Sequence, residues 1–201
     1  MVEVIEDIAA LEALYGIVSE PAKVKVARMM TPAYRRWIMA SRYCILSTVG
    51  PEGADGSPRG DDGPVVRELD ERTLAMPDWR GNNRIDSLRN IVRDGRAALM
   101  FMVPGVDIVV RVNARARLTA DPALCETFEQ RGKHPRTVIL FDIDEIYAQC
   151  PKAMLRSSLW GVERVEGLPT LGEMLKDATS GAYDGDEFDR TYVPDDQVKM
   201  W

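Results

Sequence analysis

The feature of this sequence that most limits its fold is a long alternation of apolar and polar residues over positions 106–118. Every even position in this stretch is apolar. The odd positions are polar, with one apolar exception at Val109: they hold Asp107, Arg111, Asn113, Arg115 and Arg117. Because successive side chains of a β-strand point to opposite faces, this pattern predicts one long strand with a single face in a core.

Several other segments also have the composition of β-strands. Residues 96–103 are almost wholly apolar, which predicts a strand buried on both faces. Further candidate strands lie at 44–49, 65–69, 73–77 and 137–149, and another begins near Ser57. Strands in close succession, with short helices between them, favour an antiparallel β-barrel with peripheral helices over a parallel sheet. The predicted fold class is therefore mainly β (α+β).

Two short sequences in the middle of the chain mark helix starts. Thr31 can cap a helix whose first residue is Pro32, and Asp121 followed by Pro122 repeats this arrangement. The second of these helices is expected to close at Gly132.

The chain is expected to form a single domain over residues 1–201, because it contains no internal repeat and no linker. Residues 1–30 are expected to form an N-terminal helical extension. Apolar residues at helical spacing predict a helix over 3–18, which Pro21 would end. Residues 167–201 form a C-terminal tail, in which the sequence LGEMLKDA predicts one helix.

Charge and hydropathy exclude several classes of partner. The net charge of −6 disfavours nucleic acid binding. No stretch approaches the roughly 18 consecutive apolar residues of a membrane-spanning helix, so no membrane partner is expected. The acidic, amphipathic N-terminus is unlike a signal peptide, which predicts a cytoplasmic location.

The chain contains a single histidine, His134, and three widely spaced cysteines. Neither a histidine-rich metal site nor a zinc knuckle is compatible with this inventory, so no metal site is expected. Any catalytic triad would have to use His134, which lies in RGKHPR and is expected to be a surface turn residue. No catalytic residue is assigned from the sequence.

An anion site is predicted where residues 77–84, PDWRGNNR, lead into a helix. Asn82 or Asn83 is a good N-cap, so unpaired backbone N–H groups would point outward at the start of this helix. Arg80 and Arg84 flank it, and Ser87 adds a hydroxyl one turn later. Such a site suits a phosphomonoester. The alternative is an ordinary capped helix with solvated arginines.

Five motifs occur in order between about Thr31 and Trp160: SPRGD, PDWRGNNRIDSLRNI, a buried strand ending in FMVPG, RVNARARL and CPKAMLRSSLW. Together they resemble the FMN-binding split-barrel proteins related to pyridoxamine 5'-phosphate oxidase. The resemblance implies a six-stranded antiparallel split β-barrel that forms a homodimer. It also implies two FMN molecules per dimer, each in a cleft between the subunits.

The resemblance also assigns cofactor-binding residues. Arg59 would lie on the strand that faces the flavin. The segment around the ribityl phosphate would comprise Asp78, Arg80, Asn82, Asn83, Arg84 and Ser87. The C-terminal motif would approach the cofactor from the partner subunit or cover its rim, through Lys152, Arg156, Ser157 and Trp160.

The chain departs from the family pattern in two places. The usual VNG of the long strand is Val112-Asn113-Ala114 here, which puts a bulge at this point in doubt. The basic, proline-containing signature with which true pyridoxamine phosphate oxidases hold their substrate is not found, so vitamin B6 oxidation is not expected.

Three functional classes remain open from the sequence. The first is an FMN-dependent oxidoreductase that acts on a small, unidentified substrate, with a nicotinamide donor binding transiently over the flavin. The second is a non-catalytic flavin-binding or redox-sensing protein. The third is a split barrel that uses deazaflavin or haem, although the lone histidine argues against haem.

Overall fold

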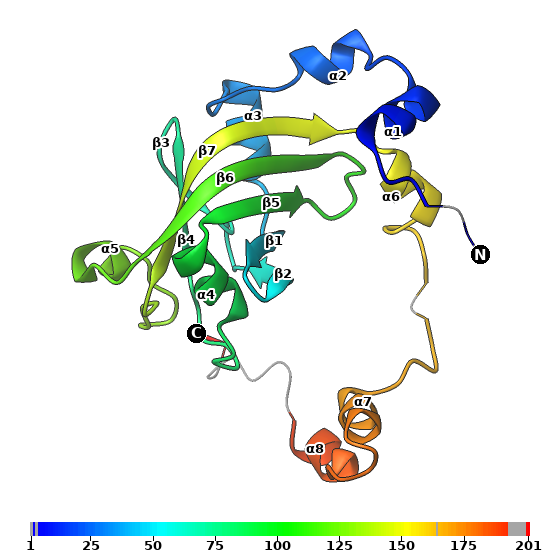
Figure 1. Cartoon of the computed structure of the whole chain (residues 1–201). Helices are drawn as coiled ribbons and strands as arrows, with labels where there is room; N and C mark the ends of the chain where they lie inside the picture. Colours follow the sequence, from blue (N-terminus) through cyan, green and yellow to red (C-terminus); the bar gives the residue numbers. More distant parts are fainter. Residues whose placement is uncertain (1, 3, 164, 193–199) are drawn as a thin grey trace.

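The computed structural model describes residues 2, 4–163, 165–192 and 200–201. In this part of the chain, seven strands form one antiparallel sheet in the order β2-β1-β5-β6-β7-β4-β3 (Figure 1). Their bounds are β1 Tyr43–Gly50, β2 Gly53–Gly60, β3 Arg67–Asp70, β4 Thr73–Pro77, β5 Arg96–Met102, β6 Val109–Thr119 and β7 Val138–Gln149. The predicted antiparallel β fold with peripheral helices is confirmed. The sheet has one strand more than the six expected, and it stays open between its edge strands β2 and β3.

The long alternation of the sequence forms β6, at the centre of the sheet. Val110, Val112, Ala114 and Ala116 are buried on one face, as the pattern predicts. The register of β6 and β7 shifts between Asn113 and Ala114, because Asp144 of β7 is the unpaired extra residue. A bulge is thus present beside Ala114, but β7 contains the added residue and Ala114 needs no positive φ.

Strand β5 buries one face in the single chain. Ala97, Leu99 and Phe101 point into the core, whereas Met100 and Met102 on the other face are only partly buried. The prediction of burial on both faces is therefore wrong for the isolated chain. An apolar outer face remains beside β1.

Eight helices lie in the described residues around this sheet. Their bounds are α1 Ile8–Tyr15, α2 Glu20–Val24, α3 Pro32–Ile38, α4 Asp86–Arg93, α5 Pro122–Glu126, α6 Lys152–Ser157, α7 Leu171–Ala178 and α8 Gly185–Thr191. Thr31 caps α3 and Asp121 caps α5, as predicted, but α5 ends at Glu126 and not at Gly132. The expected helix over 3–18 is shorter than predicted. Pro21 lies in the first turn of α2 instead of only ending a helix, because proline needs no N–H partner in a first helical turn.

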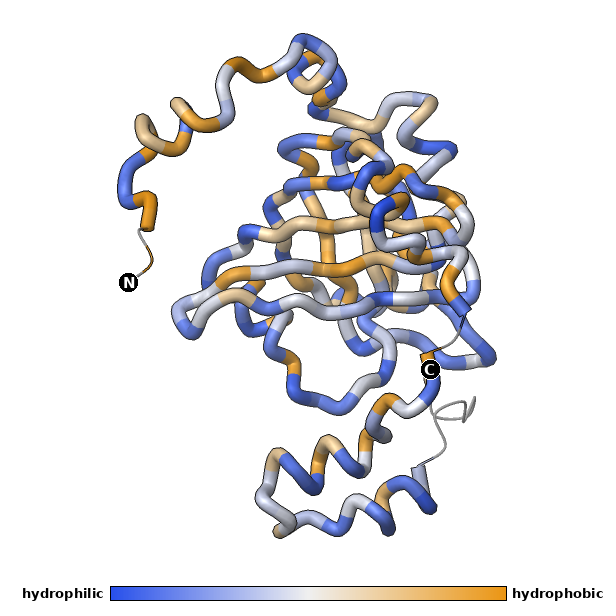
Figure 2. The backbone as a smooth tube through the Cα atoms, turned by 90° about the vertical axis from the view of Figure 1, so that its right-hand side faces the viewer, coloured by the Kyte–Doolittle hydropathy of each residue, from blue (hydrophilic) through white to orange (hydrophobic). Residues whose placement is uncertain are grey.

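The segments that carry α1, α2, α7 and α8 extend away from the sheet. Helices α1 and α2 bury no residue, and apolar residues recur along this arm (Figure 2). Helices α7 and α8 pack on each other as a hairpin, in which Thr170 and Glu173 form a capping box. The sequence predicts α7 but not α8. No helix among the described residues is long and apolar enough to cross a membrane.

Candidate functional site

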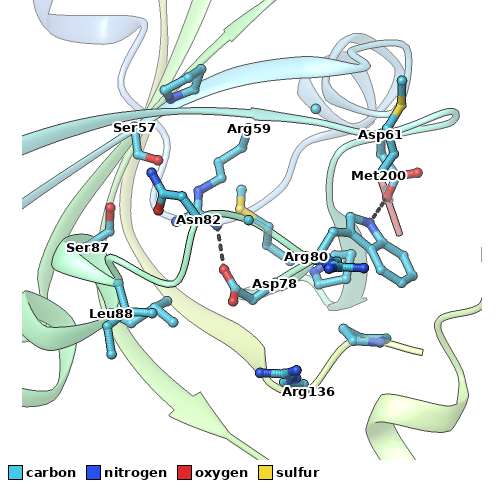
Figure 3. A pocket seen from close by; sticks show the side chains of 18 of the residues that line it. Ser57, Arg59, Asp61, Asp78, Arg80, Asn82, Ser87, Leu88, Arg136 and Met200 are labelled. Atoms are coloured by element: carbon cyan, nitrogen blue, oxygen red, sulfur yellow. Dashed lines mark hydrogen bonds and ion pairs between the residues drawn. The ribbon is translucent and has the colours of Figure 1, made fainter. Parts of the chain in front are cut away.

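A cleft of about 1140 Å³ opens beside strand β2 and the segment that joins β4 to α4. One side is formed by residues 55–62 of β2 and the loop after it, and another by residues 76–88 (Figure 3). Residues 133–136, which precede β7, complete the wall together with Met200 and Trp201. Segments far apart in the sequence therefore meet here.

The floor of the cleft contains an ion pair between Arg59 and Asp78. Nη1 of Arg59 lies 2.6 Å from Oδ1 of Asp78, and each side chain is 19% exposed. The backbone N–H of Asp78 donates to the carbonyl of Thr137 at 3.0 Å, which ties this floor to the start of β7. Nε of Arg59 is buried and has no hydrogen-bond partner among the described residues. A buried donor without a partner costs about 1–3 kcal/mol, so a ligand acceptor placed here would be favoured.

Helix α4 starts later than the sequence predicts. The carbonyl oxygen of the Asn82 side chain accepts from the backbone N–H of Arg84 at 3.0 Å, and the residue at the N-cap is Ile85. Asn83 and Ile85 both have positive φ, 61° and 53°, which prevents the helix from continuing toward Asn82. The predicted Asn N-cap is therefore wrong. Both asparagines nevertheless line the cleft.

Carboxylates compete for the donors at the start of α4. Arg84 pairs with Asp86, and the hydroxyl of Ser87 donates to Asp55. The side chain of Arg84 is 80% exposed, so it can turn from Asp86 toward a ligand at little cost. An anion bound here would take over these donors together with the unpaired N–H groups of the first turn of α4.

The opposite wall contributes basic residues that the site prediction missed. Lys133, His134 and Arg136 line the cleft and are exposed. Nδ1 of His134 lies 2.9 Å from the carbonyl oxygen of Phe128, so Nδ1 is the protonated nitrogen of this bond. His134 is thus exposed in a turn, as predicted, but this turn borders the cleft. The basic run RGKHPR was the available signal.

Two tryptophans lie together at the cleft. The rings of Trp79 and Trp201 are 5.2 Å apart and nearly perpendicular. Nε1 of Trp79 donates to Asp61 at 2.7 Å, and the side-chain amide of Gln130 donates to the same carboxylate at 2.8 Å. Neither tryptophan was predicted as a site residue, because nothing local in the sequence links position 201 to position 79.

The predicted cofactor residues separate into two groups. Seven of them line the cleft: Arg59, Asp78, Arg80, Asn82, Asn83, Arg84 and Ser87. The other four do not line it in this chain: Lys152, Arg156, Ser157 and Trp160. They belong to α6 and the residues after it, at the far end of β7 (Figure 1). There Nε1 of Trp160 donates to the carbonyl of Val106 at 3.1 Å.

Comparisons with known proteins found one matching family model and several similar solved structures. The family model for pyridoxamine 5'-phosphate oxidase matches residues 30–150. A HupZ variant from Group A Streptococcus is 16% identical with a TM-score of 0.50, over 60% of this chain and 100% of that chain. General stress protein 26 from Bacillus anthracis is 17% identical with a TM-score of 0.42, over 56% and 88% of the two chains. An F420 reductase is 14% identical with a TM-score of 0.45, over 58% and 98%. No curated protein sequence matches the chain.

Proposed function

Because the chain belongs to the pyridoxamine 5'-phosphate oxidase family, we propose that it is an FMN-binding flavoprotein and an oxidoreductase for a small substrate. One observation carries this proposal. Arg59 lines a cleft where seven predicted cofactor residues meet, and its buried Nε has no partner among the described residues. A guanidinium donor without a partner, in a partly apolar cleft, favours a ligand that offers it an acceptor atom, such as the polar edge of a flavin ring.

Different residues of the cleft would bind different parts of FMN. Arg84, Arg80 and Ser87 would bind the phosphate at the start of α4, where charge-assisted hydrogen bonds are strongest. Arg59 would donate to the polar edge of the ring, and Asp78 holds Arg59 in that orientation. Bound FMN would supply the redox chemistry, while the protein supplies position and electrostatics.

We further propose that the protein acts as a homodimer. The four predicted residues of the C-terminal motif lie away from the cleft of their own chain, so a second copy would have to bring them to it. A suitable surface lies on the outer face of β1 and β5, where Tyr43 is paired with Met102 and Ile45 with Met100. Tyr43 is exposed, and the other three side chains are only partly buried. Sedimentation should give a dimer, whereas a stable monomer that binds FMN fully would contradict this proposal.

Titration of the flavin-free protein with FMN tests the cofactor. Flavin bound in the cleft should quench the emission of Trp79 and Trp201, and Trp79→Phe should reduce the quenching. Trp37 of α3, which is outside the cleft lining, provides a matched control as Trp37→Phe. Saturable quenching that is unaffected by Trp79→Phe would place the flavin elsewhere. Anaerobic reduction of the loaded protein by NADH or NADPH then separates an oxidoreductase from a flavin-binding protein without turnover.

A further inference from the structure

We propose that the wall of the cleft formed by Lys133, Arg136 and the Trp79–Trp201 pair binds a second nucleotide, of the adenosine diphosphate class. We name this surface the basic-aromatic wall. This inference depends on the proposed function in one respect: it takes the start of α4 to be the site of the FMN phosphate. In Figure 3, Arg136 lies across Asp78 from Ser57 and Asn82, so the basic half of this wall lies away from these two residues.

The cations of the basic-aromatic wall are exposed, and no salt bridge to another described residue engages them. Neither Lys133 nor Arg136 forms an ion pair among the described residues, whereas Arg59 and Arg84 in the same cleft are paired. The protein has a net charge of −6 overall, so any attraction to a phosphate must be local. Two exposed cations at the mouth of a cleft, with no ion-pair partner among the described residues, would provide it.

The backbone that carries these cations is held in place. Residues 130 and 133 exchange two backbone hydrogen bonds, of 3.0 and 2.9 Å. His134 is bonded to the carbonyl of Phe128, and the carbonyl of Thr137 accepts from Asp78. The segment from 133 to 136 is therefore held at both ends. A preordered backbone segment loses less conformational entropy when its side chains bind a phosphate.

The aromatic half of the wall supplies a stacking surface. The indole of Trp79 is held by its bond to Asp61, and Trp201 packs against it edge to face. Both side chains are partly exposed. Indole faces stack well on nucleobases. Asp62 also lines the cleft, and its carboxylate can accept a hydrogen bond from a ribose hydroxyl. Cations next to paired tryptophans favour a phosphorylated nucleotide over a simple anion.

The cleft has room for this second ligand. Its volume of about 1140 Å³ exceeds the range of roughly 300–1,000 Å³ typical of a site for one ligand. Lys133, Arg136, Trp79 and Trp201 line part of this volume. We therefore expect the second nucleotide to bind to FMN-saturated protein as well as to flavin-free protein.

Calorimetric titration with ADP, adenosine and pyrophosphate, on both FMN-saturated and flavin-free protein, tests this inference. ADP should bind more tightly than adenosine or pyrophosphate to both forms of the protein. Lys133→Ala/Arg136→Ala should weaken ADP binding by about tenfold or more and leave FMN affinity within twofold. Trp201→Ala should weaken ADP several-fold and leave pyrophosphate unchanged. The control Arg89→Ala/Arg93→Ala, on α4, should change none of these affinities.

Three results would overturn the inference. Absence of ADP binding to either form of the protein is the first. Pyrophosphate binding as tight as ADP binding would remove the aromatic half of the wall from the site. Equal losses of ADP and FMN affinity in Lys133→Ala/Arg136→Ala would assign the wall to the flavin. If FMN does not bind but ADP binds through Lys133 and Arg136, the proposed function fails while this inference stands.

Discussion

Arg59 of β2 and Asp78 of the β4–α4 segment are joined across the floor of the cleft by a hydrogen-bonded ion pair of 2.6 Å. The two residues are 19 positions apart, and no other ion pair among the described residues joins these two segments. Both side chains are largely shielded from water. The pair therefore links the strand under the proposed flavin ring to the segment proposed to hold its phosphate.

Replacing Asp78 by Asn should lower the free energy of unfolding by about 1.5–3 kcal/mol, because it removes a charged partner from a largely buried guanidinium. Urea unfolding measures this change. The control Asp142→Asn breaks the more exposed pair with Arg117, where the distance is 3.1 Å, and should cost under about 1 kcal/mol. Equal losses of unfolding free energy for the two variants would show that the Arg59–Asp78 pair stabilises the fold no more than an exposed pair does.

Cys44, which is paired with Arg59 in the β1–β2 register, should make stability depend on alkaline pH. Burial raises the pKa of this thiol from 9.0 to about 12, although the charge of Arg59 lowers it in part. Between these values the unfolded chain releases a proton that the folded chain keeps. Stability is therefore unaffected below pH 9 and falls as the pH rises toward 12, by about 1.4 kcal/mol per pH unit.

The measurement is the difference in unfolding free energy between wild type and Cys44→Ala at pH 8, 9.5 and 10.5. Wild type should lose more stability than the variant above pH 9, because groups other than Cys44 titrate equally in both. Cys150 is exposed, so Cys150→Ala should keep the wild-type slope. Parallel slopes for wild type and Cys44→Ala would contradict the predicted shift.

Gly172 should be essential for the α7–α8 hairpin. A Cβ atom at this position would lie 2.1 Å from the carbonyl oxygen of Gly185, so the two helices could not approach as they do. Gly172→Ala should abolish hydrogen-exchange protection in α7 and α8 and leave FMN affinity within twofold, since neither helix lines the cleft. Lys176→Ala removes only an exposed pair with Asp186 and should preserve this protection. Protection that survives Gly172→Ala would rule out this close helix contact.

Local patterns predicted most of the fold. The alternation of β6 and the helix starts at Thr31 and Asp121 are encoded within a few residues, so the sequence alone determines them. The extent of helix α4 was mispredicted because Asn82 bonds to Arg84 and Ile85 adopts a left-handed conformation. Residue propensities do not reveal a positive φ at an isoleucine, since β-branched residues disfavour it.

Long-range placement accounts for the rest of the site. The motif around Arg59 and the segment from Asp78 to Ser87 were predicted to meet, and they do. Lys133, Arg136 and Trp201 join the same cleft only through the tertiary path of the chain, which no local spacing encodes. Conversely, Trp160 and the rest of its motif lie away from the cleft. They follow β7, and the cleft lies near the other end of that strand.

The most direct test of the central claim compares the affinities of FMN and riboflavin for wild type and Arg84→Ala. FMN carries a phosphate that riboflavin lacks, and each guanidinium–phosphate contact contributes about 1.5–3 kcal/mol. Arg84→Ala should therefore weaken FMN binding by roughly ten- to a hundredfold and leave riboflavin binding almost unchanged. Arg89→Ala and Arg93→Ala, further along α4, should leave FMN affinity within about twofold. If all three variants bind FMN alike, the start of α4 does not hold the phosphate and the proposed cofactor site is wrong.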